Sequence, residues 1–224
     1  MELNIKDQEV NVEKPSLFGI ITSPSLQFEK IKNSNVIWKS FWILAALTGI
    51  VYLINTYAYI LSPEGKKANA ESVLDIPLYW QLGSGFFTGA IGFIIGAFIT
   101  AAIYKVFMMF MNNDTPFKKL LAISVYGSVI TTLGLFINGL LAIIIGETGE
   151  EMYTGLAPLF TSFNDVLHGA MKSFEIFTIW SLVISALGLH ITAGLSKKQA
   201  TVVAIIFFIF SVAFGAIGGM MPKF

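Results

Sequence analysis

The sequence WQLGSGFFTGAIGFIIGAFITAAIYKVFMMF, from Trp80 to Phe110, decides the fold of this chain. At 1.5 Å of rise per helical residue, the stretch is longer than the roughly 30 Å hydrocarbon layer of a membrane. Lys105 lies near its end, where a long side chain can extend its ammonium group to the membrane surface. We predict a transmembrane helix here that tilts or protrudes.

Four glycines of this stretch are spaced to share one helix face. Gly85, Gly89, Gly92 and Gly96 lie at offsets of four, seven and eleven residues. Small residues let membrane helices approach closely, whereas leucine facing lipid gives them no reason to associate. We predict that all four are helix-packing residues at the centre of a bundle. The pattern leaves open whether the glycines pack within the chain or against a second protein.

The composition indicates a membrane protein. The chain is 55% hydrophobic and only 12% charged, with a mean hydropathy of +0.73, whereas soluble domains carry roughly 25% charged residues. The formal net charge is zero, which argues against a nucleic-acid partner. The absence of cysteine excludes disulfides and thiolate sites.

Five apolar segments predict an all-α bundle of five transmembrane helices. The predicted spans are residues 41–61, 80–110, 120–145, 174–195 and 200–220. Residues 38–224 would form the transmembrane domain, and residues 1–37 a cytoplasmic tail with an interfacial helix. No cleavable signal precedes the first span, which we expect to act as an uncleaved insertion signal.

Lysine placement predicts the orientation. Three junctions on one side are rich in lysine and poor in acids, and the opposite connections carry half of the acidic residues of the chain. Because cytoplasmic loops are enriched in lysine, we predict a multi-pass protein of the cell membrane with a cytoplasmic amino terminus and an extracellular carboxyl terminus. The lysines concerned are Lys30, Lys32, Lys39, Lys118, Lys119, Lys197 and Lys198.

The segment before the first span predicts an amphipathic helix. Residues 1–14 are interpreted as a flexible tail, and Ser23-Pro24 is a favourable helix start. The helix would lie on the membrane surface with its lysines near lipid headgroups; the alternative is a solvated linker. Its candidate partner-binding residues are Phe18, Pro24, Phe28 and Ile31.

A second amphipathic helix is predicted in the connection before the fourth span. Apolar residues between Leu156 and Ala170 follow the spacing of a helix face. This helix would float at the outer membrane interface or cap the bundle. Phe160, Phe163 and Leu167 are its candidate partner-binding residues.

Small and weakly polar residues also recur in spans three and four. Gly127, Thr131 and Asn138 mark one stripe, and Ser185 and Gly188 mark another. We interpret them as helix-packing residues whose polar groups bond between helices. The functional alternative is a polar path through the bundle, which would also include Thr192.

The sequence predicts no enzyme. We find no catalytic motif and expect no cofactor-binding or metal-binding residues. His190 lies within span four and is interpreted as a neutral histidine bonded between helices. His168 and Asp165 have the spacing of a metal-binding pair but lack a third ligand.

Three stretches resemble the YIP family of Ypt-interacting-protein-like membrane proteins. They are SPSLQFEKIK at residues 23–32, GLSKKQA at residues 194–200, and the tripeptide Tyr126-Gly127-Ser128. The chain lacks the DLYGP-type motif of eukaryotic members, so the resemblance is to the bacterial branch. It implies a five-span protein without enzymatic activity that assists an ABC-type exporter complex of permease, ATPase and adaptor, linked to resistance to antimicrobial peptides or toxins.

Three functions therefore follow as hypotheses. The first is an accessory or assembly subunit whose partners are membrane lipid and the exporter complex. The second is an autonomous small transporter or channel that uses the polar stripes. The third is a membrane-shaping protein whose amphipathic segments insert into the leaflets.

Overall fold

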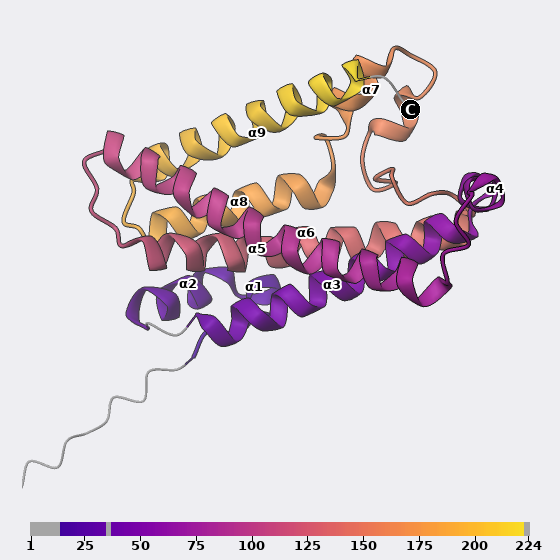
Figure 1. The fold of residues 1–224 in the computed structure, drawn as a ribbon. Helices are drawn as coiled ribbons and strands as arrows, with labels where there is room; N and C mark the ends of the chain where they lie inside the picture. Colours follow the sequence, from indigo (N-terminus) through magenta and orange to yellow (C-terminus); the bar gives the residue numbers. More distant parts are fainter. Residues whose placement is uncertain (1–13, 35–36, 222–224) are drawn as a thin grey trace, which may run out of the picture.

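The computed structural model describes residues 14–34 and 37–221, and within these ranges the fold is all-helical (Figure 1). The predicted tail and the predicted extracellular terminus lie largely or wholly outside these ranges. The helices are α1 Gly19–Thr22, α2 Pro24–Asn33, α3 Trp38–Leu61, α4 Pro63–Glu71, α5 Leu78–Phe110, α6 Phe117–Ile145, η1 Ala157–Phe160, α7 Asp165–Met171, α8 Ile176–Ile191 and α9 Lys197–Met220.

Long apolar helices form the bundle. By length and composition, α3, α5, α6 and α9 can each cross a membrane, whereas α8 is apolar but has only 16 residues. The predicted spans thus coincide with helices to within a few residues, except that the fourth helix ends at Ile191 rather than at residue 195. Four helices are therefore candidate spans, and the fifth span stays a prediction.

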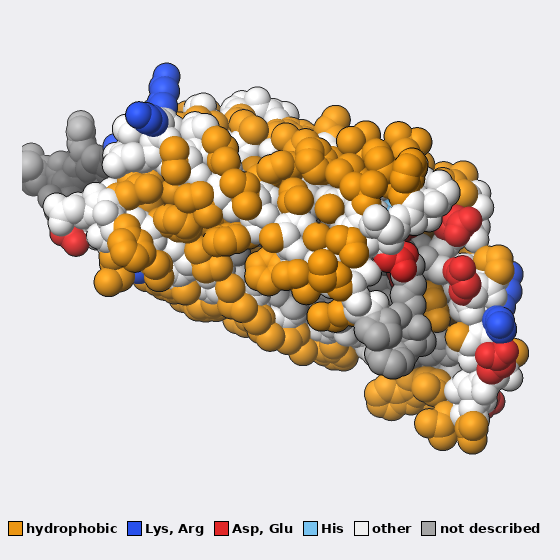
Figure 2. Space-filling model, turned by 90° about the horizontal axis from the view of Figure 1, so that it is seen from above, with side chains coloured by type: hydrophobic (Ala, Val, Ile, Leu, Met, Phe, Trp, Pro, Cys, Tyr) orange, Lys and Arg blue, Asp and Glu red, His pale blue; other side chains and the backbone are white. Residues whose placement is uncertain are grey.

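The helices are arranged as a chain of neighbours. The helix α3 packs against α5 and α6, α6 packs against α8, and α8 packs against α9. In Figure 1, α1 and α2 lie at one end of the bundle, and α4 and α7 lie at the other. Figure 2 shows hydrophobic side chains covering the middle of the molecule and charged side chains near its two ends.

Local signals in the sequence set several helix ends. The helix α9 begins with a capping box in which Ser196 and Gln199 bond reciprocally. The helix α6 ends where Gly146 adopts a φ of 83° and donates its N–H to Ala142 O. Such a left-handed residue after the last turn is typically glycine.

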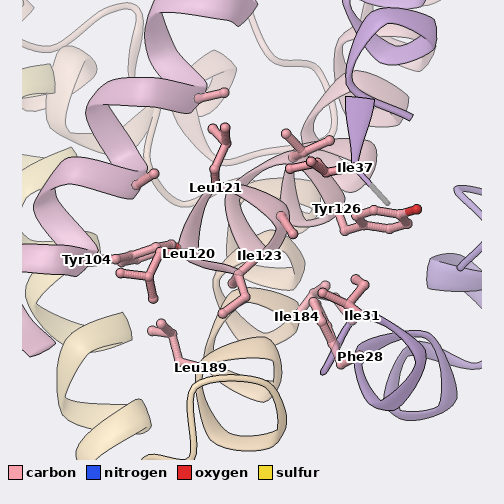
Figure 3. Packing of buried hydrophobic residues seen from close by; sticks show 14 of the residues in the cluster. Phe28, Ile31, Ile37, Tyr104, Leu120, Leu121, Ile123, Tyr126, Ile184 and Leu189 are labelled. Atoms are coloured by element: carbon pink, nitrogen blue, oxygen red, sulfur yellow. The ribbon is translucent and has the colours of Figure 1, made fainter. Parts of the chain in front are cut away.

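The buried core lies toward the end of the bundle that carries α2. Figure 3 shows Phe28 and Ile31 of α2 beside Ile184 of α8, with Ile123 and Tyr126 of α6 nearby. The predicted helix is present, and its position at the membrane surface stays a prediction. The apolar side of α2 faces protein, because α6 and α8 offer a buried surface on which it packs.

The predicted outer helix is corrected. Instead of one helix through residues 156–170, the chain forms the short η1 and α7. Asn164 separates them with an extended backbone, and its side-chain oxygen accepts the N–H of Leu167. An N-cap of this kind starts a new helix and so interrupts the predicted one.

Candidate functional site

The four glycines of α5 divide into two pairs. A Cβ at Gly85 would overlap Thr56, and one at Gly89 would overlap Tyr52, so both glycines allow α3 to approach closely. Gly92 and Gly96 are exposed, and a Cβ at either would meet nothing within 4 Å. Close packing within the described residues is therefore found for Gly85 and Gly89, and helix packing at Gly92 and Gly96 stays a prediction.

The physical reason is the path of the contact along α5. The buried positions advance in steps of mostly four residues, and each such step rotates by about 40° around a helix of 3.6 residues per turn. The contact thus moves away from Gly92 and Gly96 toward another side of the helix. The buried row is Gly85, Gly89, Phe93, Ala97, Ala101, Tyr104 and Met108.

The outer surface beside Gly92 and Gly96 is apolar and open. We call it the α5 outer face, and its exposed residues are Thr88, Ile91, Gly92, Ile95, Gly96 and Ile99. Two glycines four residues apart, flanked by isoleucines, have the pattern that lets a second membrane helix make close backbone contact. This pattern predicts that a helix from outside the described residues packs against this face.

The N-terminal hairpin, made of α1 and α2, is docked on the bundle. Phe28 is 0% exposed and Ile31 is 2% exposed, so neither candidate partner-binding residue is on the surface. Gly188 of α8 makes the space for the Phe28 ring, because a Cβ there would overlap two ring atoms of Phe28 and a methyl group of Ile123. Two predicted site residues thus meet, although Phe28 was expected to bind a partner and Gly188 to pack helices.

Polar contacts secure the hairpin. Lys119 of α6 donates from Nζ to Ile31 O at 2.6 Å, to Lys32 O at 2.8 Å and to Ser34 O, and so caps the carboxyl end of α2. Thr192 Oγ1 donates to Phe28 O at 2.9 Å. The Lys119 contact was missed from the sequence, because no local spacing connects Lys119 to α2.

A hydroxyl-lined cavity of about 150 Å³ lies between α5, α6, α8 and α9. Thr131 and Ser185 line it, and Gly127 faces Ser185 across it. The cavity has room for a few water molecules. Its full lining is Thr100, Tyr104, Ser124, Gly127, Ser128, Thr131, Ser181, Leu182, Ser185 and Phe207.

Asn138 belongs to a separate network at the opposite end from the hairpin. Its amide donates to Gly134 O at 2.9 Å and to Thr154 Oγ1 at 2.8 Å. Thr154 in turn donates to Glu175 Oε1 at 2.6 Å, and Glu175 caps α8 by accepting the N–H groups of Phe177 and Thr178. The residues of the predicted polar path therefore lie in three separate places, with Thr131 in the cavity, Asn138 in this network and Thr192 at the hairpin.

Glu175 was missed, although the sequence held the signal. The residue lies one position inside the predicted span 174–195 and is 3% exposed. A carboxylate at the start of a membrane helix is a favourable partner for its free N–H groups. Its position at the start of the predicted span is the signal that indicates a helix cap.

The connection before α8 carries the remaining candidate partner-binding residues and a group of ionisable side chains. Phe163 is 60% exposed, and Phe160 and Leu167 are partly buried. His168 Nε2 lies 3.1 Å from Glu151 Oε2, and Lys172 Nζ lies 3.1 Å from Glu151 Oε1. Among the residues that the structure describes, no three metal-ligating side chains gather into a site.

Burial also raises the pKa of the Tyr153 phenol in this connection, and the carboxylates of Glu147, Glu151 and Glu64 raise it further. Tyr153 is therefore held in its neutral form.

On the other side of the molecule, Phe18 is 71% exposed and Pro24 begins α2 with partial burial. Phe18 is thus the one strongly exposed candidate of the N-terminal hairpin.

Comparison with known proteins supports the family resemblance. Residues 18–218 match the family model described as the Yip1 domain. The chain is 35% identical to Membrane protein YknW of Bacillus subtilis (strain 168), over 99% of this chain and 97% of that protein. No solved structure matches.

Proposed function

This chain belongs to the Yip1 domain family of membrane proteins, and from that premise we propose that it is a non-enzymatic accessory subunit that binds another membrane protein. The observation that carries the proposal is the α5 outer face. Gly92 and Gly96 are exposed, and a Cβ added at either would have no other described segment within 4 Å. Close helix packing is the role that such a pair performs in membranes.

The partner we propose is an ABC-type exporter complex, and the activity that it would support is resistance to antimicrobial peptides or toxins. This choice rests on the family resemblance of the sequence motifs. In the proposed setting the protein lies in the cell membrane with its amino terminus in the cytoplasm. The α5 outer face then lies within the bilayer, where a permease helix can reach it.

An affinity purification tests the proposal. Tagged full-length protein is recovered from its own membrane in mild detergent, and the co-purified proteins are quantified by mass spectrometry. We expect an ATPase and its permease in a fixed ratio with the wild type. Gly92→Leu or Gly96→Leu is expected to reduce their recovery about tenfold, equivalent to about 1.4 kcal/mol of binding free energy.

Gly218→Leu is the matched control, because an added Cβ at Gly218 of α9 also meets nothing within 4 Å. It makes the same chemical change on a different helix and should leave recovery unchanged. Equal recovery in all variants would show that the α5 outer face is not the docking surface. Recovery of the chain alone, folded and in high yield, would instead favour an autonomous function.

The structure gives less support to the two alternatives. A transport path along the polar stripe would need Thr131, Asn138 and Thr192 to share one space, and they lie in the cavity, the Glu175 network and the hairpin contact respectively. Membrane shaping by α2 would need its apolar side to face lipid, and Phe28 is buried against α6 and α8.

A further inference from the structure

A groove of about 440 Å³ runs between α8 and α9 and opens sideways. Its walls are apolar except for Thr201. Small side chains create it, because Ala186 on one wall and Ala204 on the other leave the space that larger residues would fill. The lining residues are Phe174, Ile179, Leu182, Val183, Ala186, Thr201, Ala204, Ile205 and Phe208.

One end of this α8–α9 groove is marked by an aromatic pair. The rings of Phe174 and Phe208 meet edge to face with centroids 5.1 Å apart. The hydroxyl groups of Ser173 and Ser211 are hydrogen-bonded at 2.8 Å and hold the two segments together near that pair. These two contacts hold the start of α8 against α9 at this end of the groove.

The other end continues into a second, mainly apolar pocket of about 250 Å³. This pocket shares Val183, Ala186 and Thr201 with the groove and adds His190 and Lys197. Neither lining contains an acidic residue. Figure 2 shows lysine side chains at the end of the molecule where α9 begins. The site thus combines an apolar channel with a cationic mouth.

The ring of His190 is held in place at this mouth. Its Nδ1 lies 2.7 Å from Leu195 O, and a carbonyl oxygen only accepts hydrogen bonds. The proton on Nδ1 therefore points to the backbone and fixes the ring against the turn between α8 and α9. The orientation of the mouth is thereby set by the same turn that begins α9.

The dimensions of the groove match one acyl chain. From Lys197 to Phe208, α9 rises about 16 Å, which is close to half of the roughly 30 Å hydrocarbon layer. The groove of about 440 Å³ and the pocket next to it therefore offer an extended hydrocarbon chain apolar walls over about half of the bilayer.

We propose that the α8–α9 groove binds one acyl chain of an anionic phospholipid, with the lipid phosphate against the ammonium group of Lys197. The chain would enter from the leaflet at the Lys197 end, and its terminal methyl group would lie near Phe174 and Phe208. Lysine near the membrane surface attracts anionic lipid, so the cationic mouth selects the headgroup and the groove selects the chain.

The test uses full-length protein in mild detergent and two lipids with identical chains, phosphatidylglycerol and phosphatidylcholine. Native mass spectrometry measures the lipid that stays bound. We expect the wild type to retain one phosphatidylglycerol in preference to phosphatidylcholine. Ala204→Leu and Ala186→Leu fill the groove from opposite walls and should each lower retention about tenfold. If one variant misfolds, the other still tests the groove.

Lys197→Gln tests the headgroup contact and should weaken phosphatidylglycerol binding about fivefold. Lys198→Gln removes the same charge at a residue that does not line the pocket, and Ala213→Leu enlarges an exposed residue of α9 outside the groove. Both controls should bind as the wild type does. Thermal unfolding of each variant identifies any loss of fold.

Three results would overturn the proposal. Equal retention of the two lipids would exclude a headgroup site, and equal weakening by Lys197→Gln and Lys198→Gln would indicate diffuse attraction. Unchanged retention in both groove-filling variants would place the lipid elsewhere. A crosslinker at Ala204 that captures a protein helix in native membranes, and no lipid, would assign the groove to a different occupant.

Discussion

Gly188 decides at the scale of one residue where the N-terminal hairpin can sit, because the Phe28 ring occupies the space where a Cβ would be. We predict that Gly188→Ala displaces that ring and destabilises the protein by about 1–3 kcal/mol, as overfilling of a packed site does. Thermal unfolding measures the loss. Trypsin cleavage at Lys32, which is exposed beside the buried Ile31, reports release of the hairpin.

A double-mutant cycle separates this effect from a general weakening of α8. Phe28→Leu has a smaller side chain, so adding it to Gly188→Ala should cost less than the two single changes together. Strict additivity would mean that the glycine and the ring do not share one space. Gly218→Ala, at a position with open surroundings, is the control and should change stability little.

At the scale of elements, Lys119 connects α6 to the N-terminal hairpin by capping α2. We predict that Lys119→Met loosens α2, because the last carbonyl groups of the helix lose a charged donor that is worth about 1.5–3 kcal/mol. Hydrogen exchange of residues 24–34 should accelerate. Lys118→Met makes the same change at an exposed neighbour and should leave that exchange unaffected; equal acceleration in both would deny the cap.

Element positions could be predicted from the sequence, but the faces of the elements could not. The length of an apolar run identifies a membrane helix, and Ser23-Pro24 correctly marks the start of α2. In lipid, however, an outward face is as apolar as an inward one. Gly89 and Gly92 therefore look alike in the sequence, although the first is buried and the second is exposed.

The same limit applies to the candidate site. Phe18 and Phe28 belong to one amphipathic segment, yet only tertiary packing shows that Phe18 is exposed and Phe28 is enclosed. Contacts between distant residues, such as Thr192 with Phe28, leave no local pattern to read. The network of Asn138 and Glu175 could be predicted only in part. Asn138 lies on a polar stripe and Glu175 at the start of a helix, but no sequence pattern indicates that Thr154 links them.

At the scale of the whole molecule, the short helix α8 decides the topology. Its 16 residues rise about 24 Å, less than the roughly 30 Å of hydrocarbon. Both ends continue in polar groups that bond to other parts of the protein, Glu175 to Thr154 at one end and Thr192 to Phe28 O at the other. Polar backbone at membrane depth is tolerated where protein encloses it, so we predict that α8 crosses as the fifth span.

Cysteine labelling tests this topology cleanly, because the natural chain contains no cysteine. Three successive connections between the long helices carry the exposed residues Ser72, Asp114 and Thr161. Lys198 is exposed at the start of α9. With five spans and a cytoplasmic amino terminus, cysteines at Ser72 and Thr161 should react with a membrane-impermeant maleimide in intact cells. Those at Asp114 and Lys198 should react only after permeabilisation. If Thr161 and Lys198 instead reacted from the same side, α8 would not cross, the chain would have four spans, and the mouth of the α8–α9 groove would share a leaflet with α7.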